Sequence, residues 1–167
     1  MFVIEPLERR HDKADFSCGT EALDVYLQRQ AGQDFRRNIA SVFVAVENGS
    51  DKVIGYYTLA AAEIPYMRLR NDEQKAMPHY GNLPAIRLGR LAVDVSFQGR
   101  MLGILLLTDA MNYSLCLPIA WQFFLVDAKE SAADFYKKFG FVSCIDNDKI
   151  LYLTRKNVVK FSGAIKK

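Results

Sequence analysis

The stretch Arg87-Leu-Gly-Arg-Leu-Ala-Val-Asp94, followed by Gln98-Gly-Arg-Met-Leu-Gly103 and an apolar segment, decides the fold of this chain. The first part predicts a buried strand, and the second predicts a glycine-bearing turn that opens a helix. The first amides of a helix have no partner within it, so they point together toward one place. Such an N-terminus binds anions, and phosphate or pyrophosphate suits it well. The pattern therefore predicts a phosphate-binding loop at residues 98–103.

A second pattern, further along the chain, joins a tyrosine to a helix stop. It reads Ala132-Ala-Asp-Phe-Tyr136-Lys-Lys-Phe-Gly140-Phe. A phosphate-cradling loop followed by a tyrosine-bearing helix that ends in Gly-Phe points to acyl transfer from coenzyme A. A phenol with a pKa of about 10 is protonated at neutral pH, so Tyr136 is our candidate for the general acid that protonates the departing thiolate. Ordinary aromatic packing on a helix is the alternative.

Length and composition predict one domain, residues 1–167. Half of the 167 residues are hydrophobic, and the net charge of +3 excludes a histone-like polycation. Basic residues gather instead in a C-terminal tail, residues 155–167, which holds five basic residues and no acidic one. Arg29, Arg36 and Arg37 form a second basic group.

The cysteines predict a reduced, cytoplasmic setting. Cys18, Cys116 and Cys144 are odd in number and lack the spacing of a metal site, so we expect no metal. We expect Cys116 and Cys144 to be buried packing residues rather than acyl-carrying nucleophiles. Acidic residues precede any long apolar stretch at the N-terminus, and no apolar run approaches about 20 residues, so we expect neither a signal peptide nor a membrane span.

The order of predicted elements indicates an α/β chain with a mixed, mostly antiparallel sheet and helices on both faces. A helix capped by Thr20 lies between two early strands, and Asn48-Gly49 predicts a hairpin turn. Residues 64–85 read as a polar loop with three prolines and a short helix near 68–76. The expected strands are 2–7, 41–47, 52–63, 86–94, 122–127 and a final hairpin at 141–154; the other expected helices are 101–116 and 131–138.

These motifs resemble the GCN5-related N-acetyltransferases over nearly the whole chain. The coenzyme A loop of that superfamily, Gln/Arg-x-x-Gly-x-Gly/Ala, aligns with residues 98–103, and its later helix matches Ala132, Tyr136 and Gly140-Phe141. The resemblance implies the GNAT fold, with a central twisted sheet, and acetyl-CoA as the cofactor. The cofactor-binding residues that we predict are Leu91, Ala92, Val93, Gln98, Gly99, Arg100, Met101, Leu102, Gly103, Ala132 and Phe135. One backbone N–H among residues 91–93 would polarise the thioester carbonyl.

A narrower resemblance is to the acetyltransferase toxins of bacterial toxin–antitoxin pairs. It implies acetylation of the α-amino group of aminoacyl-tRNA, a block of translation, a ribbon-helix-helix antitoxin and a homodimer. The segments that carry it are Phe16-Ser-Cys-Gly19, Leu23-Asp-Val-Tyr-Leu27, Arg36-Arg-Asn38, Leu88-Gly-Arg-Leu-Ala-Val-Asp94 and Val126-Asp-Ala-Lys129.

Met101 departs from the family pattern, because a glycine is expected at the middle of the loop. Glycine lets the backbone approach a pyrophosphate closely, whereas methionine adds a Cβ and a long side chain. We expect weaker coenzyme A binding, either as a tolerated variation or as an inactivating substitution.

No strong general base stands out. Glu63 and His79 are weak candidates, and a solvated strand end is the commoner role for such a carboxylate. A lysine amine, with a pKa of about 10.4, needs more help to lose its proton than an α-amine, with a pKa of about 8. The acceptor is therefore better predicted as an α-amine.

Basic side chains form the predicted tRNA contacts, with scattered surface charge as the alternative. The tail could instead be disordered or serve the antitoxin. Two other functions stay open: an acetyltransferase of a small amine or a protein N-terminus, and a catalytically impaired acyl-CoA-binding module. The predicted tRNA-binding residues are Arg36, Arg37, Arg87 and Arg90, with the tail lysines Lys156, Lys160, Lys166 and Lys167.

Overall fold

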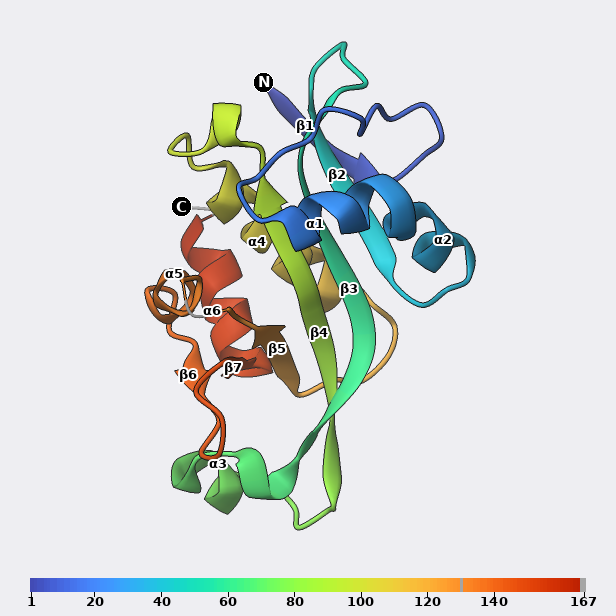
Figure 1. The fold of residues 1–167 in the computed structure, drawn as a ribbon. Helices are drawn as coiled ribbons and strands as arrows, with labels where there is room; N and C mark the ends of the chain where they lie inside the picture. Colours follow the sequence, from blue (N-terminus) through green and yellow to red (C-terminus); the bar gives the residue numbers. More distant parts are fainter. Residues whose placement is uncertain (130, 166–167) are drawn as a thin grey trace. The chain divides into compact units, whose positions relative to one another are not determined.

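A computed structural model describes residues 1–129 and 131–165 (Figure 1). The chain forms two compact units: Met1–Ala60 with Gly89–Ala110, here the first unit, and Ala61–Leu88 with Met111–Lys167, here the second. Seven strands are hydrogen-bonded in the order β1-β2-β3-β4-β5-β7-β6, and β3 and β4 run through both units. The mixed α/β architecture is confirmed.

The first unit begins with an antiparallel ladder. β1 (Phe2–Pro6) pairs with β2 (Ser41–Glu47), which pairs with β3 (Val53–Pro65). The predicted turn between β2 and β3 contains Gly49 with φ +83°, a left-handed conformation that glycine adopts readily. β4 (Asn82–Val93) follows β3 in the sheet order.

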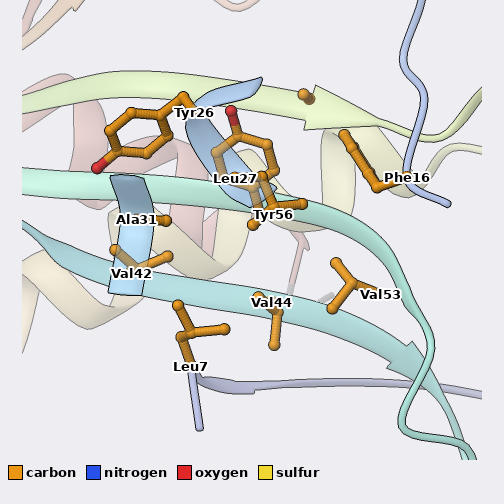
Figure 2. Close-up of a cluster of buried hydrophobic side chains, with 10 residues drawn as sticks. Leu7, Phe16, Tyr26, Leu27, Ala31, Val42, Val44, Val53 and Tyr56 are labelled. Carbon is orange, nitrogen blue, oxygen red and sulfur yellow. The ribbon is translucent and has the colours of Figure 1, made fainter. Parts of the chain in front are cut away.

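Helices cover both faces of this ladder because successive strand side chains alternate between the faces. On one face, α1 (Glu21–Val25), a π-helical turn η1 (Tyr26–Gln30) and α2 (Ala31–Arg36) enclose a buried cluster with β2 and β3. Figure 2 shows Tyr26, Leu27 and Ala31 gathered with Tyr56 and the valines of the strands. On the other face, Tyr57 donates a hydrogen bond to Asp109 of α4 (Leu102–Leu115), with 2.6 Å between Oη and Oδ2.

Gly55 lets α4 approach β3 closely. A Cβ at this position would lie 3.0 Å from Leu106 Cδ1, 3.2 Å from the carbonyl oxygen of Ala92 and 3.4 Å from Leu102 Cδ2. Any larger residue would push the first turns of α4 away from the strand. The glycine therefore fixes the position of the helix that follows the predicted cofactor loop.

The second unit holds the rest of the chain. β4 and β5 (Phe123–Asp127) are parallel, and β5 pairs antiparallel with β7 (Ile150–Thr154), which pairs with β6 (Val142–Ser143). The core of this unit includes Phe123, Leu125 and Tyr152. Its helical segments are η2 (Tyr66–Arg68), α3 (Asn71–Ala76), α5 (Ala133–Lys137) and α6 (Arg155–Ile165).

The predicted loop at 64–85 is too long at both ends. β3 extends to Pro65, and β4 starts at Asn82, so Pro84 lies within a strand. Proline lacks an N–H, but its carbonyl still accepts a hydrogen bond from the N–H of Gln122, at 2.9 Å. A strand position that uses only the carbonyl of a proline keeps its ladder.

The alternative that the basic tail is disordered is wrong up to Ile165, because residues Arg155–Ile165 form α6. Val158 is fully buried and Ser162 is largely buried, whereas Lys156 and Lys160 are exposed, so one helix face packs and the other is basic. Lys166 and Lys167 lie outside the described residues.

Thr20 is the N-cap residue of α1, as predicted, but its side chain makes no capping bond; its carbonyl accepts from the N–H groups of Leu23 and Asp24 instead. The expected burial of Cys116 is wrong, because this residue is exposed just after the end of α4, whereas Cys144 is buried as expected.

Across residues 1–129 and 131–165, no helix is long and apolar enough to cross a bilayer. The same residues contain no group of three or more histidine, cysteine or acidic side chains arranged to hold a metal ion.

Candidate active site

The C-terminal end of β4 presents a backbone edge. The ladder between β4 and β5 ends at Leu88↔Val126, before Leu91, Ala92 and Val93. The N–H of Asp94 donates to the carbonyl of Ile54 on β3, and the Ala92 carbonyl faces β3 as well. Because N–H groups alternate in direction along a strand, those of Leu91 and Val93 point away from β3. The backbone N–H predicted to polarise the thioester carbonyl is therefore that of Leu91 or Val93, because the N–H of Ala92 points toward β3.

Asp94 anchors the loop that follows β4. Its Oδ1 accepts from the N–H of Ser96 at 2.9 Å, and its Oδ2 accepts from the N–H of Ser17 at 3.1 Å. Burial opposes ionisation of the carboxyl, but the N–H groups of Ser96 and Ser17 outweigh it and hold the pKa of Asp94 below its usual range. A short helical turn, η3 (Val95–Phe97), starts here. Asp94 belongs to a motif of the sequence, but the motif did not predict that its carboxylate anchors the loop after β4.

Gln98 reinforces the same anchor. Its side-chain amide donates to the carbonyl of Cys18 at 2.9 Å and to the carbonyl of Val93 at 3.0 Å. Two of the segments that carried the family resemblance, residues 16–19 and 88–94, are therefore bonded to each other through this loop. The loop backbone is held in place from both sides before any ligand arrives.

Met101 has the left-handed backbone that the family pattern reserves for glycine. Its φ is +64°, Gly99 nearby has φ +75°, and α4 begins at Leu102. An L-residue in this region costs roughly 1–2 kcal/mol. The Met101 side chain is 67% exposed, so it displaces nothing in the core. The substitution thus retains the loop's bend and stores strain in it.

The other loop residues divide between exposed and buried positions. Gly99 and Arg100 are exposed, and the Arg100 guanidinium lies 5.1 Å from the ring centre of Phe97. Leu102 is buried, and Gly103 falls within the first turn of α4. The backbone of 99–103 is thus available to an anion while Leu102 fastens it to the core. This arrangement fits the diphosphate of coenzyme A.

Tyr136 lies one residue before the end of α5, in a helix stop that explains the Gly-Phe motif. The N–H of Phe141 bonds the Tyr136 carbonyl, and the N–H of Gly140 bonds the Lys137 carbonyl. Gly140 has φ +89°, and the rings of Tyr136 and Phe141 meet edge to face at 5.5 Å. This is a Schellman motif with its usual hydrophobic contact. The motif fixes both the backbone and the ring of Tyr136.

The environment of Tyr136 keeps its phenol protonated. The residue is 7% exposed, and burial raises its pKa above that of an ordinary tyrosine. Phe135 packs against it with ring centres 5.1 Å apart, and Ala132 accepts its backbone N–H at 3.4 Å. A buried, protonated phenol suits a proton donor and not a base.

The predicted basic residues differ in what they contact. Arg36, Arg37 and Arg87 are exposed. Arg90 is half-buried, with its guanidinium 3.6 Å from the ring centre of Tyr26, and the Tyr26 hydroxyl donates to Asp34. Arg90 therefore has a structural cation–π contact in addition to its predicted tRNA role.

The weak base candidates gain little from the structure. Glu63 is exposed and accepts a hydrogen bond from the Asn82 side chain at 3.0 Å. His79 is exposed and lies beside Tyr66, with ring centres 4.8 Å apart.

Comparison with known proteins places the chain among acetyltransferases. Residues 38–143 match the model of the acetyltransferase (GNAT) domain. The probable toxin TacT of Sinorhizobium fredii is 31% identical over 111 residues, which cover 66% of this chain and 61% of that protein. A tRNA-acetylating toxin of Mycobacterium tuberculosis is 36% identical over 101 residues, or 60% of this chain and 58% of its own. The matches thus span about three fifths of these curated relatives.

Solved structures agree over a longer span. AtaT complexed with acetyl-methionyl-tRNAfMet is 32% identical with a TM-score of 0.87, covering 96% of this chain and 98% of its own. AtaTR bound with AcCoA is 33% identical with a TM-score of 0.82, covering 95% and 96%. The family model, the anchored loop after β4 and the tyrosine-bearing helix stop agree, and the chain belongs to the GNAT acetyltransferase family.

Proposed function

We propose that this protein is an N-acetyltransferase that moves the acetyl group of acetyl-CoA to the α-amino group of aminoacyl-tRNA and so blocks translation. The likeness of nearly the whole chain to AtaT, solved with acetyl-methionyl-tRNAfMet, is the observation that carries this proposal. The sequence kinship to a tRNA-acetylating toxin supports it. Residues 1–167 act as a single acetyltransferase domain.

The chain's own residues supply binding, polarisation and a proton. Backbone amides of residues 98–103 hold the diphosphate, and the edge at Leu91–Val93 lies along the pantetheine arm. Acetyl-CoA supplies the activated thioester. An N–H of Leu91 or Val93 stabilises the developing oxyanion, and Tyr136 donates its phenolic proton to the departing thiolate. Ala132 and Phe135 place Tyr136.

An α-amine is the acceptor that this site suits. Glu63 and His79 are exposed and belong neither to the loop at 98–103 nor to the tyrosine-bearing helix. An α-amino group with a pKa of about 8 is partly neutral at physiological pH and needs only a solvent base. A lysine amine would need a stronger one.

The partners follow the same kinship. Arg36, Arg37, Arg87 and Arg90 contact tRNA phosphates, and the exposed basic face of α6 adds to them. An antitoxin of the ribbon-helix-helix class covers the active face, and the toxin acts as a homodimer. AtaT solved with the C-terminus of AtaR supports an antitoxin partner. Three free cysteines suit the reducing cytoplasm.

The test is transfer of labelled acetyl from acetyl-CoA to a pool of charged tRNA. Uncharged tRNA, free amino acids and small amines serve as parallel acceptors. We expect label on the aminoacyl group of charged tRNA alone. Label only on free amines would replace the proposal with a small-amine acetyltransferase. Coenzyme A binding with no transfer to any acceptor, restored by Met101→Gly, would instead indicate a disabled loop.

A further inference from the structure

A cavity in the first unit lies outside the cofactor machinery. Its volume is about 430 Å³, which is within the usual range for small-molecule sites. Leu7 is buried and Phe35 is half-buried, and both supply apolar lining. The full lining is Leu7, Glu8, Arg9, Lys13, Gly32, Phe35 and Arg36. It therefore combines an apolar wall with three cationic side chains.

Gly32 lets two of these cations converge. A Cβ on Gly32 would lie 3.2 Å from Arg36 Nη1 and 3.9 Å from Lys13 Nζ. Both charged groups therefore lie close to Gly32 of α2, where no side chain intervenes. The only acidic lining residue, Glu8, is already paired with Arg10, at 3.0 Å between Oε2 and Nε. Within residues 1–129 and 131–165, the ion pairs involve neither Arg9, Lys13 nor Arg36.

The convergence has an electrostatic cost. Burial, and then the nearby Arg36 charge, lower the pKa of Lys13 below that of an ordinary lysine. A like charge this close disfavours the protonated state of Lys13. A bound anion would reverse the effect and stabilise the protonated lysine.

We propose that this cavity binds one nucleotide of a single-stranded RNA, with its phosphate between Lys13 and Arg36 and its base against Phe35. Adjacent cations and an aromatic side chain are the combination that holds unpaired nucleotides. An isolated carboxylate would leave the aromatic wall and the third cation, Arg9, unused. The source of the nucleotide rests on the proposed function, because the RNA substrate would supply it; the cavity stands on its own contacts.

The first test measures binding of a fluorescein-labelled, 5′-phosphorylated RNA trinucleotide by anisotropy. The Lys13 and Arg36 variants leave the cofactor loop unchanged, so a loss of affinity in these variants reports binding in the cavity. Arg36→Gln and Lys13→Gln should each weaken binding by about fivefold or more, as expected for a lost charge-assisted contact. The slope of log affinity against log salt should fall by about 0.7 for each variant. Arg29→Gln, an exposed arginine outside the cavity lining, is the matched control.

Phe35→Leu separates stacking from charge. It should weaken binding by about fivefold or more, because a base–aromatic stack is lost, and leave the salt slope unchanged. Circular dichroism and the midpoint of thermal unfolding check that the leucine keeps the fold. AMP should displace the trinucleotide, and adenosine should not.

Some results would overturn the proposal. Equal affinities for Arg36→Gln and Arg29→Gln would do so, as would failure of AMP to compete. The probe carries no aminoacyl group, so its binding is independent of acetyl transfer. If the wild-type protein acetylates tRNA but the cavity variants bind the probe with unchanged affinity, only the cavity proposal is rejected. If Arg36→Gln loses probe binding but the wild-type protein acetylates no tRNA, the cavity stands and only the proposed function is rejected.

Discussion

Two turns of this molecule contain a residue with the same left-handed backbone conformation, but the residue types differ. At the end of α5, Gly140 has φ +89°, and at the start of α4, Met101 has φ +64°. Glycine accepts this conformation at little cost, while a residue with a Cβ is strained by roughly 1–2 kcal/mol. The turn after Tyr136 is therefore relaxed, and the turn of the cofactor loop is held against strain.

The holding groups lie outside the strained turn. Asp94 and Gln98 bond the loop to the segment at Ser17 and Cys18, and Leu102 is buried in the core. Strained backbone persists where its surroundings over-determine it. The bend of this loop therefore depends on its anchors, whereas the bend after α5 depends on its glycine.

Tyr136→Phe should have the largest effect on activity. It removes the proposed proton donor and keeps the ring that packs on Phe141, so we expect kcat for acetyl transfer to fall by about 100-fold or more with little change in stability. Tyr80→Phe, at an exposed tyrosine, is the control and should leave kcat unchanged. A Tyr136→Phe enzyme with normal kcat would assign the residue to packing.

Asp94→Asn tests the anchor of the strained turn. One of the two N–H groups loses its carboxylate acceptor, and we expect a loss of about 1–3 kcal/mol in the free energy of unfolding at neutral pH. The native pKa of Asp94 is lowered, so its contribution exists above the unfolded pKa and is lost as the pH falls through the folded one.

The difference between wild type and Asp94→Asn should therefore shrink in urea titrations moved from pH 7 to pH 3. Asp72→Asn, at an exposed position on α3, removes the same formal charge and controls for net charge. A gap that stays constant with pH would reject the ionised anchor.

Gly140→Ala tests the relaxed turn. A Cβ there would meet Leu153 Cδ2 at 3.7 Å, an ordinary contact, so the cost comes from φ alone. We expect a destabilisation of about 1–2 kcal/mol and a fall in kcat, because the Schellman stop also places Tyr136. Thermal unfolding and initial rates measure the two effects. Unchanged unfolding would mean that the turn relaxes by another route.

Met101→Gly tests the strained turn directly and should have the smallest effect. Relief of strain exceeds the added freedom of the unfolded chain, so we expect a gain of about 0.5–1 kcal/mol in stability. Coenzyme A should also bind more tightly, because the backbone can approach the diphosphate more closely. Calorimetric titration measures this, and Met67→Gly, at an exposed methionine outside the loop, controls for loss of a methionine.

Most of the fold follows from the sequence because its signals are local. Strand alternation, the Asn48-Gly49 turn and the Tyr136-to-Gly140 stop each depend on neighbouring residues. The errors occurred where tertiary contacts decide. Pro84 stays in β4 because its carbonyl meets Gln122, and the basic tail is helical because Val158 finds a buried position.

The site follows the same rule. The helix start after the loop at 98–103 and the helix that carries Tyr136 to its stop at Gly140 could be predicted from short motifs. The anchoring by Asp94, the stack of Arg90 on Tyr26 and the cavity over Gly32 could not, since each joins residues distant in the sequence or depends on side-chain direction. Nothing in residues 88–94 alone indicates that Asp94 bonds to Ser17.

That bond has a consequence for the order of events during synthesis. Asp94 and Gln98 reach back 77 and 80 residues to Ser17 and Cys18. Contacts of such separation close late, after the intervening chain has been made. The cofactor loop therefore gains its final shape only once the segment around residues 94–98 has left the ribosome. A shorter nascent chain already contains Ser17 and Cys18, but without residues 94–98 it has no site for acetyl-CoA.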